Sequence, residues 1–177
     1  MNILLIGKSG EVGKIVAQDL KNFSLVCPSK KDLDLSDIQS LKNFSKYRHK
    51  FDCIINCSGQ VPKKDTKSID YFDKNVIYVV NIIEHLLHTL NHNGFFINIS
   101  SIMAFHDVVG DMLLYKLSKI SVNNYIEKCS KLDSDHKYIS IMPLILKDIS
   151  KSIMYIFQEN IQSGYVFTPN HFVSYDQ

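Results

Sequence analysis

The stretch MNILLIGKSGEVGKIVAQDL (residues 1–20) joins a short apolar run to an amphipathic run through a loop that contains Gly7, Gly10 and Gly13. The apolar run 2–7 has the length of a buried strand, and residues 11–21 show helical spacing. A glycine turn between a strand and a helix leaves backbone N–H groups free at the helix N-terminus, where an anion can bind. The stretch therefore predicts a strand, a tight turn and a helix, with or without a bound phosphate.

The same alternation of apolar and amphipathic runs continues along the chain. Strands are predicted at 2–7, 23–27, 51–56, 95–100, 137–143 and 163–168, and helices at 11–21, 36–47, 70–90, 112–131 and 147–160. The predicted strands are apolar almost throughout, which is typical of strands buried on both faces of a parallel sheet. We therefore expect an α/β fold with a doubly wound parallel sheet, in a single domain over 1–177.

Composition and charge argue against several classes of protein. The 20 lysines and arginines nearly balance the 18 aspartates and glutamates, so the net charge of +2 does not favour binding to nucleic acid. The four cysteines form no CxxC pair, and no apolar stretch has the length of a signal peptide or a membrane span. We expect a reduced, cytoplasmic protein with no membrane partner.

The glycine loop by itself does not identify a nucleotide. A Walker A loop needs a glycine where Lys8 stands and a hydroxyl residue where Ile15 stands, which excludes a P-loop triphosphatase. The dinucleotide fingerprint GxGxxG is not matched either, because Gly7, Gly10 and Gly13 are spaced by three. A tight turn without a ligand stays open as an interpretation.

A second pattern lies about a hundred residues further on. Tyr115 and Lys119 stand at i and i+4 of the predicted helix 112–131, so their side chains share one face. An ammonium near a phenol favours the phenolate, so we expect Lys119 to lower the pKa of Tyr115. Ser101 follows the strand 95–100, at the carboxyl edge where doubly wound sheets bind ligands. A Tyr-x-x-x-Lys pair is common on solvated helix faces, and only the combination points to chemistry.

With these residues in place, the sequence resembles the short-chain dehydrogenase/reductase family along nearly its whole length. The segments that carry the resemblance are GKSGEVG (7–13), DLDLSD (32–37), NCSG (56–59), Asn75, INISS (97–101) and YKLSK (115–119). The N-terminal third also resembles the dTDP-4-dehydrorhamnose reductases, which carry a further substrate domain that 177 residues would not hold. The resemblance implies a Rossmann fold and hydride transfer between a nicotinamide cofactor and a carbonyl or alcohol.

The resemblance also implies roles for individual residues. Ser101, Tyr115 and Lys119 would be catalytic, Asn75 would hold a proton-relay water, and Lys119 would also bind the nicotinamide ribose. The loop 7–13 would bind the pyrophosphate, Asp34 and Leu35 would border the adenine, and NCSG would support the fourth strand beside the cofactor ribose. The expected cofactor-binding residues are Gly7, Ser9, Gly10, Glu11, Val12, Gly13, Ser29, Lys30, Asp34, Leu35, Asn56, Cys57, Ser58, Gly59, Tyr115, Lys119 and Pro143.

The end of the second predicted strand bears on the choice of cofactor. An acidic residue there would accept the ribose hydroxyls of NAD, whereas a basic residue would meet the 2′-phosphate of NADP. The sequence offers Ser29, Lys30 and Lys31 before Asp32. We expect NADP, with Asp32 as the residue that would favour NAD instead.

Some positions depart from the family pattern. Pro143 is followed by Leu144 instead of glycine, and the next predicted helix begins almost at once, without the usual substrate-covering segment. Ser101 lies one residue further from Tyr115 than expected, so Ser100 is an alternative. The missing segment keeps a second hypothesis open, in which the protein is a catalytically weak dinucleotide-binding sensor or scaffold.

The remaining expectations concern metals and partners. His85 and His88 have no further ligands at metal spacing, so no metal is expected. Asp107 and Asp111 lie between the serine and the tyrosine, where they would reach the substrate or simply be solvated. Apolar stripes on 75–90 and 112–130 predict a homodimer or homotetramer through these helices.

Overall fold

One sheet of seven strands organises the molecule. The computed structural model describes residues 1–46, 50–62, 68–107, 109–110, 112–168 and 171–175. The strands are β1 (Asn2–Ile6), β2 (Ser24–Val26), β3 (Phe51–Asn56), β4 (Leu90–Ile99), β5 (Lys137–Met142), β6 (Gly164–Phe167) and β7 (His171–Ser174), in the order β2-β1-β3-β4-β5-β6-β7. All neighbouring pairs from β2 to β6 are parallel, and β7 alone runs antiparallel, against β6. The expected doubly wound α/β fold is confirmed.

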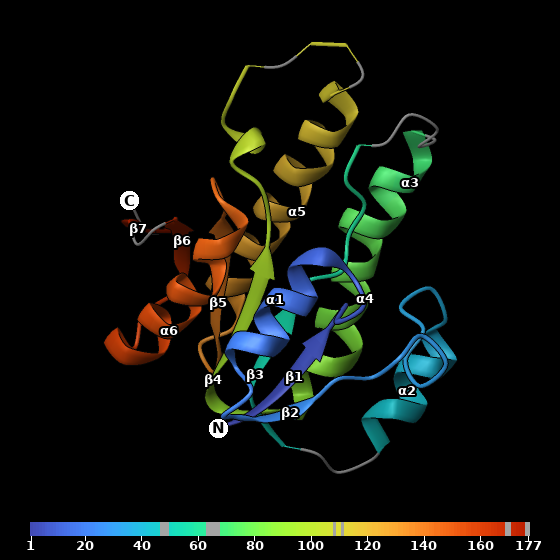
Figure 1. The fold of residues 1–177 in the computed structure, drawn as a ribbon. Helices are drawn as coiled ribbons and strands as arrows, with labels where there is room; N and C mark the ends of the chain where they lie inside the picture. Colours follow the sequence, from blue (N-terminus) through green and yellow to red (C-terminus); the bar gives the residue numbers. More distant parts are fainter. Residues whose placement is uncertain (47–49, 63–67, 108, 111, 169–170, 176–177) are drawn as a thin grey trace.

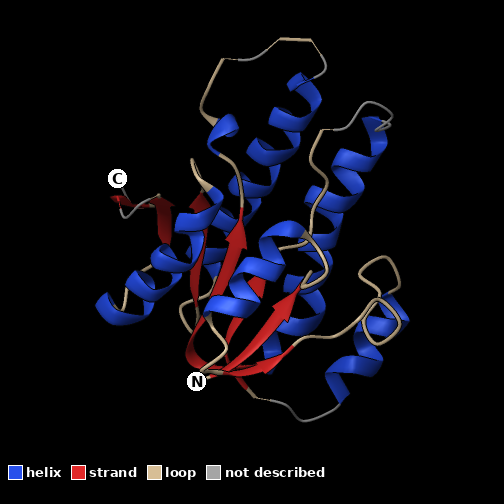
Figure 2. Ribbon diagram, in the orientation of Figure 1, coloured by secondary structure: helices blue, strands red, loops and turns tan. Residues whose placement is uncertain are grey.

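Helices cover both faces of this sheet (Figures 1 and 2). On one face lie α1 (Glu11–Asp19) and α6 (Ile149–Glu159), and on the other lie α2 (Ile38–Lys46), α4 (Tyr78–Leu86) and α5 (Met112–Leu132). The short elements are α3 (Ser68–Phe72), the π-helix η1 (Asp73–Ile77) and the 3₁₀ turns η2 (Leu87–Thr89), η3 (Ile102–Ala104) and η4 (Leu146–Asp148). The sheet is therefore the middle of three layers.

The two helical layers explain why the strands are apolar throughout. Successive side chains of a strand point to opposite faces. In β1, Leu4 and Ile6 pack into the core beneath α2, α4 and α5, whereas Ile3 and Leu5 pack into the core beneath α1 and α6. Both sets are buried, so the four residues after the exposed Asn2 are all apolar.

Two elements differ from the sequence prediction. The segment 70–90 was expected to be one helix, but the structure divides it into α3, η1, α4 and η2, with Asn75 inside the π-helical turn. The strand β7 was not predicted at all. It is an edge strand with His171 exposed and its other side chains only half-buried, so it lacks the continuous apolar run of the central strands.

The order of the strands fixes where a ligand can bind. The chain passes from β1 to β2 on one side and then returns to β3 on the other side of β1. The carboxyl ends of parallel strands open a crevice at such a reversal. The glycine loop leaves β1 at this edge, and Ser58 lies just beyond β3 at the same edge.

Candidate active site

The glycine loop turns so tightly that two of its positions require glycine. Gly7 has a φ of +83°, and a Cβ there would lie 2.7 Å from the Ser58 nitrogen. A Cβ on Gly13 would lie 2.1 Å from the Gly7 oxygen. Gly10 is the N-cap of α1, and no side chain caps this end of the helix. The first N–H groups of α1 are therefore open to an anion, as a pyrophosphate cradle requires.

A cavity of about 620 Å³ opens beside this loop. Seven of the residues expected to bind a cofactor line it, namely Gly7, Ser9, Ser29, Lys30, Asp34, Leu35 and Ser58. They come from the loops after β1, β2 and β3, which are distant in sequence and meet only through the order of the strands. The volume and the lining fit the adenosine half of a dinucleotide.

The charged side chains around this cavity are mostly lysines. Lys8, Lys14 and Lys30 line it, with Asp34 as the carboxylate. Lys30 lies 3.5 Å from Asp34, and hydrogen bonds from Ser36 hold the pKa of Asp34 below its usual value.

Asp32 is not among the residues that line this cavity. Its carboxylate accepts hydrogen bonds from the Ser29 hydroxyl at 2.6 Å and from the Ser29 backbone nitrogen at 2.9 Å. These bonds lower the pKa of Asp32. The carboxylate that would favour NAD is therefore engaged within its own turn.

Other expected cofactor residues lie near the cavity without lining it. Gly10, Glu11, Val12 and Gly13 form the start of α1, and Pro143 follows β5. Asn56 is fully buried and donates from its amide nitrogen to Asn98 Oδ1 on β4 at 2.8 Å. Asn56 thus contacts the fourth strand, as expected of the NCSG segment. The backbone of Cys57 packs closely against Gly7.

The second group of predicted residues meets at the carboxyl end of β4. Tyr115 and Lys119 lie one turn apart on α5 and are both buried, with the lysine Nζ 5.8 Å from the centre of the tyrosine ring. The same Nζ donates to the Ile99 carbonyl at 3.4 Å. Ser101 follows Ile99 by two residues and accepts a hydrogen bond from the Met103 nitrogen at 3.2 Å. The structure brings the three side chains into one cluster.

The electrostatics of this cluster correct one expectation. We expected Lys119 to lower the pKa of Tyr115. Burial instead raises the pKa of Tyr115, and a side-chain hydrogen bond with Ser101 opposes that rise. Burial also lowers the pKa of Lys119 to about 8. The physical reason is that both groups lie away from water, which disfavours the charged form of each.

Asn75 joins three elements beneath this cluster. Its Oδ1 accepts from the Gln60 nitrogen at 2.8 Å, and its Nδ2 donates to the Gln60 carbonyl at 3.1 Å and to Ser118 Oγ at 3.0 Å. A Cβ on Gly59 would lie 2.8 Å from Asn75 Oδ1 and 3.7 Å from Lys119 Nζ. The π-helical turn and α5 therefore bring Asn75 and Lys119 together next to Gly59.

The two adjacent serines face different surroundings. The Ser100 hydroxyl donates to Asn123 Oδ1 at 2.8 Å in the buried middle of α5, whereas Ser101 interacts with Tyr115.

Of the two loop aspartates, Asp107 is fully exposed and lies 3.8 Å from Lys116 Nζ. Asp111 lies outside the described residues.

The sequence prediction missed Lys8 and Lys14 of the cavity lining, and it missed three residues of the segment 71–78. The ring centre of Tyr71 lies 6.0 Å from that of Tyr115, and Lys74 and Tyr78 line the cavity. Their spacing of three and four residues places them on one helical face, which was a usable signal. The apolar residues between them lie on a different face of the predicted helix 70–90, and the prediction rested on that apolar face.

The structure also bears on metal and membrane binding. The described side chains place no group of three or more His, Cys, Asp or Glu where it would hold a metal ion. Within the described ranges, no helix has both the length and the apolar character needed to cross a membrane.

The fold and these two sites define a nucleotide-binding α/β protein with a Ser–Tyr–Lys cluster at the carboxyl edge of its sheet. The model of the NAD dependent epimerase/dehydratase family matches residues 3–145, and the chain belongs to this family. No curated protein matches the sequence.

Solved structures show the same fold. One is a candidate short-chain alcohol dehydrogenase from Burkholderia multivorans, with a TM-score of 0.85 and 16% identity over 98% of this chain and 99% of that chain. A carbonyl reductase from Pseudomonas aeruginosa has a TM-score of 0.83 and 14% identity over 98% and 99%. A small-chain dehydrogenase in complex with NADPH has a TM-score of 0.79 and 16% identity over 94% and 95%. The fold is therefore that of the short-chain dehydrogenases/reductases.

Proposed function

We propose that the protein is an NAD(P)-dependent oxidoreductase that transfers a hydride between a nicotinamide cofactor and a small-molecule carbonyl or alcohol. The observation that carries the proposal is the cluster of Ser101, Tyr115 and Lys119 at the same sheet edge as the glycine loop. A protein that only binds a dinucleotide needs the loop and the cavity but has no use for a buried tyrosine and lysine beside a serine.

The cluster supplies acid–base chemistry. The bound cofactor would provide the hydride. The Tyr115 hydroxyl donates a proton to the carbonyl oxygen of the substrate, and the Ser101 hydroxyl donates a hydrogen bond to the same oxygen as negative charge develops on it. Because burial keeps the pKa of Tyr115 raised, the tyrosine carries its proton at neutral pH and is ready to act as an acid.

Lys119 and Asn75 return the proton to Tyr115. A lysine with a pKa of about 8 holds its proton at pH 7 and releases it at little cost. Its Nζ lies close to Gly59, and Asn75, which also lies next to Gly59, binds the backbone of Gln60. A water molecule held at Asn75 would relay the proton between Lys119 and Tyr115. Lys119 would also bind the nicotinamide ribose.

NADP is the proposed cofactor. The lining of the cavity offers Lys8, Lys14 and Lys30, which suit a 2′-phosphate. Asp32 is hydrogen-bonded to Ser29 and does not line the cavity, so we expect it not to favour NAD.

The Tyr115→Phe substitution tests the proposal. The variant keeps the ring packed against Tyr71 but loses the acid, so we expect NADPH to bind normally and carbonyl reduction to fall by a factor of about 100 or more. Turnover is measured by NADPH oxidation with aromatic aldehydes, diketones and keto sugars, and binding by fluorescence titration.

Tyr125→Phe is the matched control for this experiment. Tyr125 lies on the same helix, and its hydroxyl donates to Glu84 Oε1 at 2.9 Å, away from the cluster. This variant should reduce carbonyls at the wild-type rate. Equal rates for the Tyr115→Phe variant and the wild type would show that Tyr115 is not the acid.

A nucleotide-sugar reaction is a second candidate function, because the family model that matches the chain covers epimerases and dehydratases. An epimerisation consumes no net NADPH, whereas a carbonyl reduction oxidises one NADPH for each product. Product analysis with a nucleotide sugar, in parallel with the NADPH assay, separates the two. A sensor or scaffold would bind NADPH and turn over neither type of substrate.

A further inference from the structure

Exposed apolar side chains gather at the carboxyl edge of the sheet. Twelve large hydrophobic side chains are exposed in the described part of the chain, and half of them follow β3, β4 or β5. These six, called the apolar rim from here on, are Val61 (56% exposed), Phe105 (54%), Val109 (88%), Leu144 (70%), Ile145 (48%) and Leu146 (36%). Exposed apolar residues that cluster in this way mark a binding surface.

The apolar rim lies at the same edge of the sheet as the Ser–Tyr–Lys cluster. Ser101 follows β4, and β4 lies between β3 and β5 in the sheet, so rim loops lie on both sides of it. Phe105 follows Ser101 by four residues, and Val109 leads into the first turn of α5, which carries Tyr115. In Figure 1 the loops after β4 and β5 leave the same end of the sheet.

Parts of the rim are fixed by the scaffold. The ring of Phe105 packs edge-on against Tyr165 on β6, with ring centres 5.6 Å apart, and lies 5.4 Å from Phe167. The Leu144 nitrogen donates to Thr168 Oγ1 at 2.8 Å. Both loops are therefore held against the end of β6 while their apolar side chains remain in contact with solvent.

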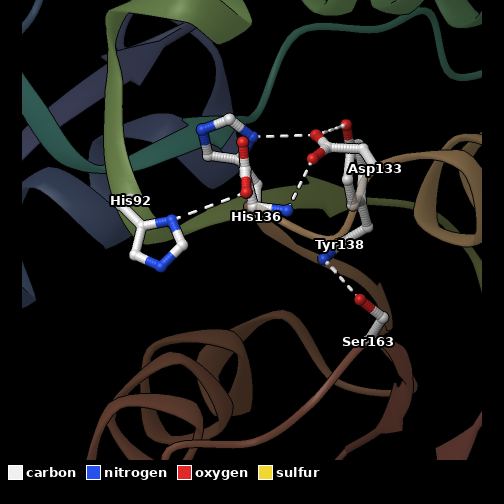
Figure 3. A network of polar contacts seen from close by, with 6 residues as sticks. His92, Asp133, His136, Tyr138 and Ser163 are labelled. Atoms are coloured by element: carbon white, nitrogen blue, oxygen red, sulfur yellow. Dashed lines mark hydrogen bonds and ion pairs between the residues drawn. The ribbon is translucent and has the colours of Figure 1, made fainter.

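The opposite edge of the sheet has a different character. There, the His136 ring donates to Asp133 Oδ2 at 2.8 Å, the Tyr138 hydroxyl donates to the same oxygen at 2.7 Å, and His92 pairs with Asp135 at 3.6 Å (Figure 3). Loops in this protein are thus not apolar in general. The apolar side chains are concentrated at the end where the reacting hydroxyls lie.

We infer that the apolar rim binds the hydrocarbon part of the substrate, so that the substrate is a carbonyl compound with an alkyl or aryl group and not a sugar. This inference rests on the proposed oxidoreductase function. An apolar group over Ser101 and Tyr115 removes the rim from water and also excludes water from the transferred proton. Each buried methylene contributes about fourfold in affinity, so a long ketone is selected over a short one.

Binding of 2-octanone and 2-butanone tests the inference. Both ketones are titrated by NMR into the full protein saturated with NADP⁺, because the oxidised cofactor cannot supply a hydride and no turnover interferes. The two ketones differ by four methylenes, and we expect 2-octanone to bind at least about thirtyfold more tightly. Leu144→Gln should reduce this ratio about tenfold or more.

Leu132→Gln is the matched control, because Leu132 is an equally exposed leucine at the far end of α5. It should keep the wild-type ratio. Equal affinity of the wild type for the two ketones overturns the inference, and so does a loss of the ratio in Leu132→Gln as large as in Leu144→Gln. Sedimentation of the same samples tests whether a second copy of the chain, instead of a substrate, covers the apolar rim. If Leu144→Gln turns a dimer into a monomer while the ketones do not bind, the rim is an interface between copies and the inference is wrong.

The outcome of this experiment is separate from that of the proposed function. Selective binding of 2-octanone without any NADPH-dependent reduction by the wild type leaves the apolar site in place and rejects the oxidoreductase. Reduction of both ketones with equal kcat/KM and equal affinity supports the oxidoreductase function and rejects the inferred apolar site.

Discussion

Lys8 shows how a single side chain sets the chemistry of the cavity. The glycines of the loop determine its backbone, and Lys8 occupies the position where a Walker A loop would need another glycine. Together with Lys14 and Lys30 it gives the adenosine cavity a basic lining. A lysine ammonium binds a phosphate as a point charge, so under the proposed function each of these residues would contribute to phosphate binding.

Lys8→Glu is expected to weaken NADPH binding more than NADH binding. The substitution replaces an attractive charge by a repulsive one, and the dissociation constant of NADPH should rise by a factor of about 10 to 100. The dissociation constant of NADH should rise by a smaller factor, because NADH carries the pyrophosphate that the loop 7–13 would bind but has no 2′-phosphate. Fluorescence titration measures both constants.

Lys31→Glu serves as the control. It makes the same change of charge in the loop after β2, at a residue that does not line the cavity. It should alter neither constant by more than about threefold. Tighter binding of NADH than NADPH by the wild type would reverse the proposed preference.

At the scale of elements, Asp133 ties the end of α5 to the start of β5. Its Oδ2 accepts from His136 and from the Tyr138 hydroxyl, and its Oδ1 accepts from the Asp135 nitrogen at 2.8 Å (Figure 3). These bonds lower the pKa of Asp133 even though burial opposes them. The folded state therefore favours the charged carboxylate more strongly than the unfolded state does.

Asp133→Asn should destabilise the fold, and the effect should depend on pH. A lowered folded-state pKa stabilises the protein above the unfolded pKa of an aspartate, about 4, and this contribution is lost as the pH falls through the folded-state pKa. At pH 7 the variant should lose about 1–3 kcal/mol of unfolding free energy, and the difference from the wild type should shrink below pH 4. Denaturant unfolding at a series of pH values measures it.

The control for this experiment is Asp135→Asn. Asp135 and His92 form a pair 3.6 Å apart in which both side chains are largely exposed. The substitution should change the unfolding free energy by about 0.5 kcal/mol or less. A difference between Asp133→Asn and the wild type that does not vary with pH would contradict the role given to the carboxylate.

At the scale of the whole molecule, the outer faces of η1 and α5 carry exposed apolar side chains. Ile77, Leu113 and Leu117 are exposed there, and the last two lie one turn apart on α5. Tyr125 and Glu84 join α5 to α4 by a hydrogen bond, so the two helices present one surface. The expectation of a homodimer or homotetramer through 75–90 and 112–130 remains a prediction.

Leu117→Glu tests the oligomeric state. A charge in the middle of the paired helices cannot be buried without a partner, so the variant should be monomeric where the wild type is a dimer. Sedimentation at micromolar concentration measures the mass of each. Leu132→Glu adds the same charge outside 112–130 and should stay dimeric. A wild type that sediments as a monomer at this concentration would reject the interface.

Much of the fold could be predicted because its signals are local. The burial of β1 on both faces made residues 3–6 continuously apolar, and the helical stripe of α4 appeared as a repeating pattern of apolar side chains. The strand β7 and the π-helical turn at Asn75 escaped prediction. A half-exposed edge strand lacks a strict pattern, and the widened turn depends on the contacts of Asn75 with Gln60 and Ser118.

The site was predictable in part. The i, i+4 spacing of Tyr115 and Lys119 is a property of the helix itself, so the sequence placed them together. The pKa of Tyr115 was not predictable, because burial depends on every element that packs around the ring, including Tyr71 from α3. The choice between Ser100 and Ser101 likewise needed the direction of each side chain at the end of β4.

The sequence by itself determined the alternation of buried strands and helices, the need for glycine after β1 and the pairing of Tyr115 with Lys119, because each is written in residues close along the chain. Only the tertiary structure decided that Lys8, Lys30 and Ser58 share one cavity and that the exposed apolar side chains after β3, β4 and β5 lie at the same sheet edge as Ser101 and Tyr115. The physical reason is the order of the strands, which brings distant loops to one edge of the sheet through hydrogen bonds that no local pattern encodes.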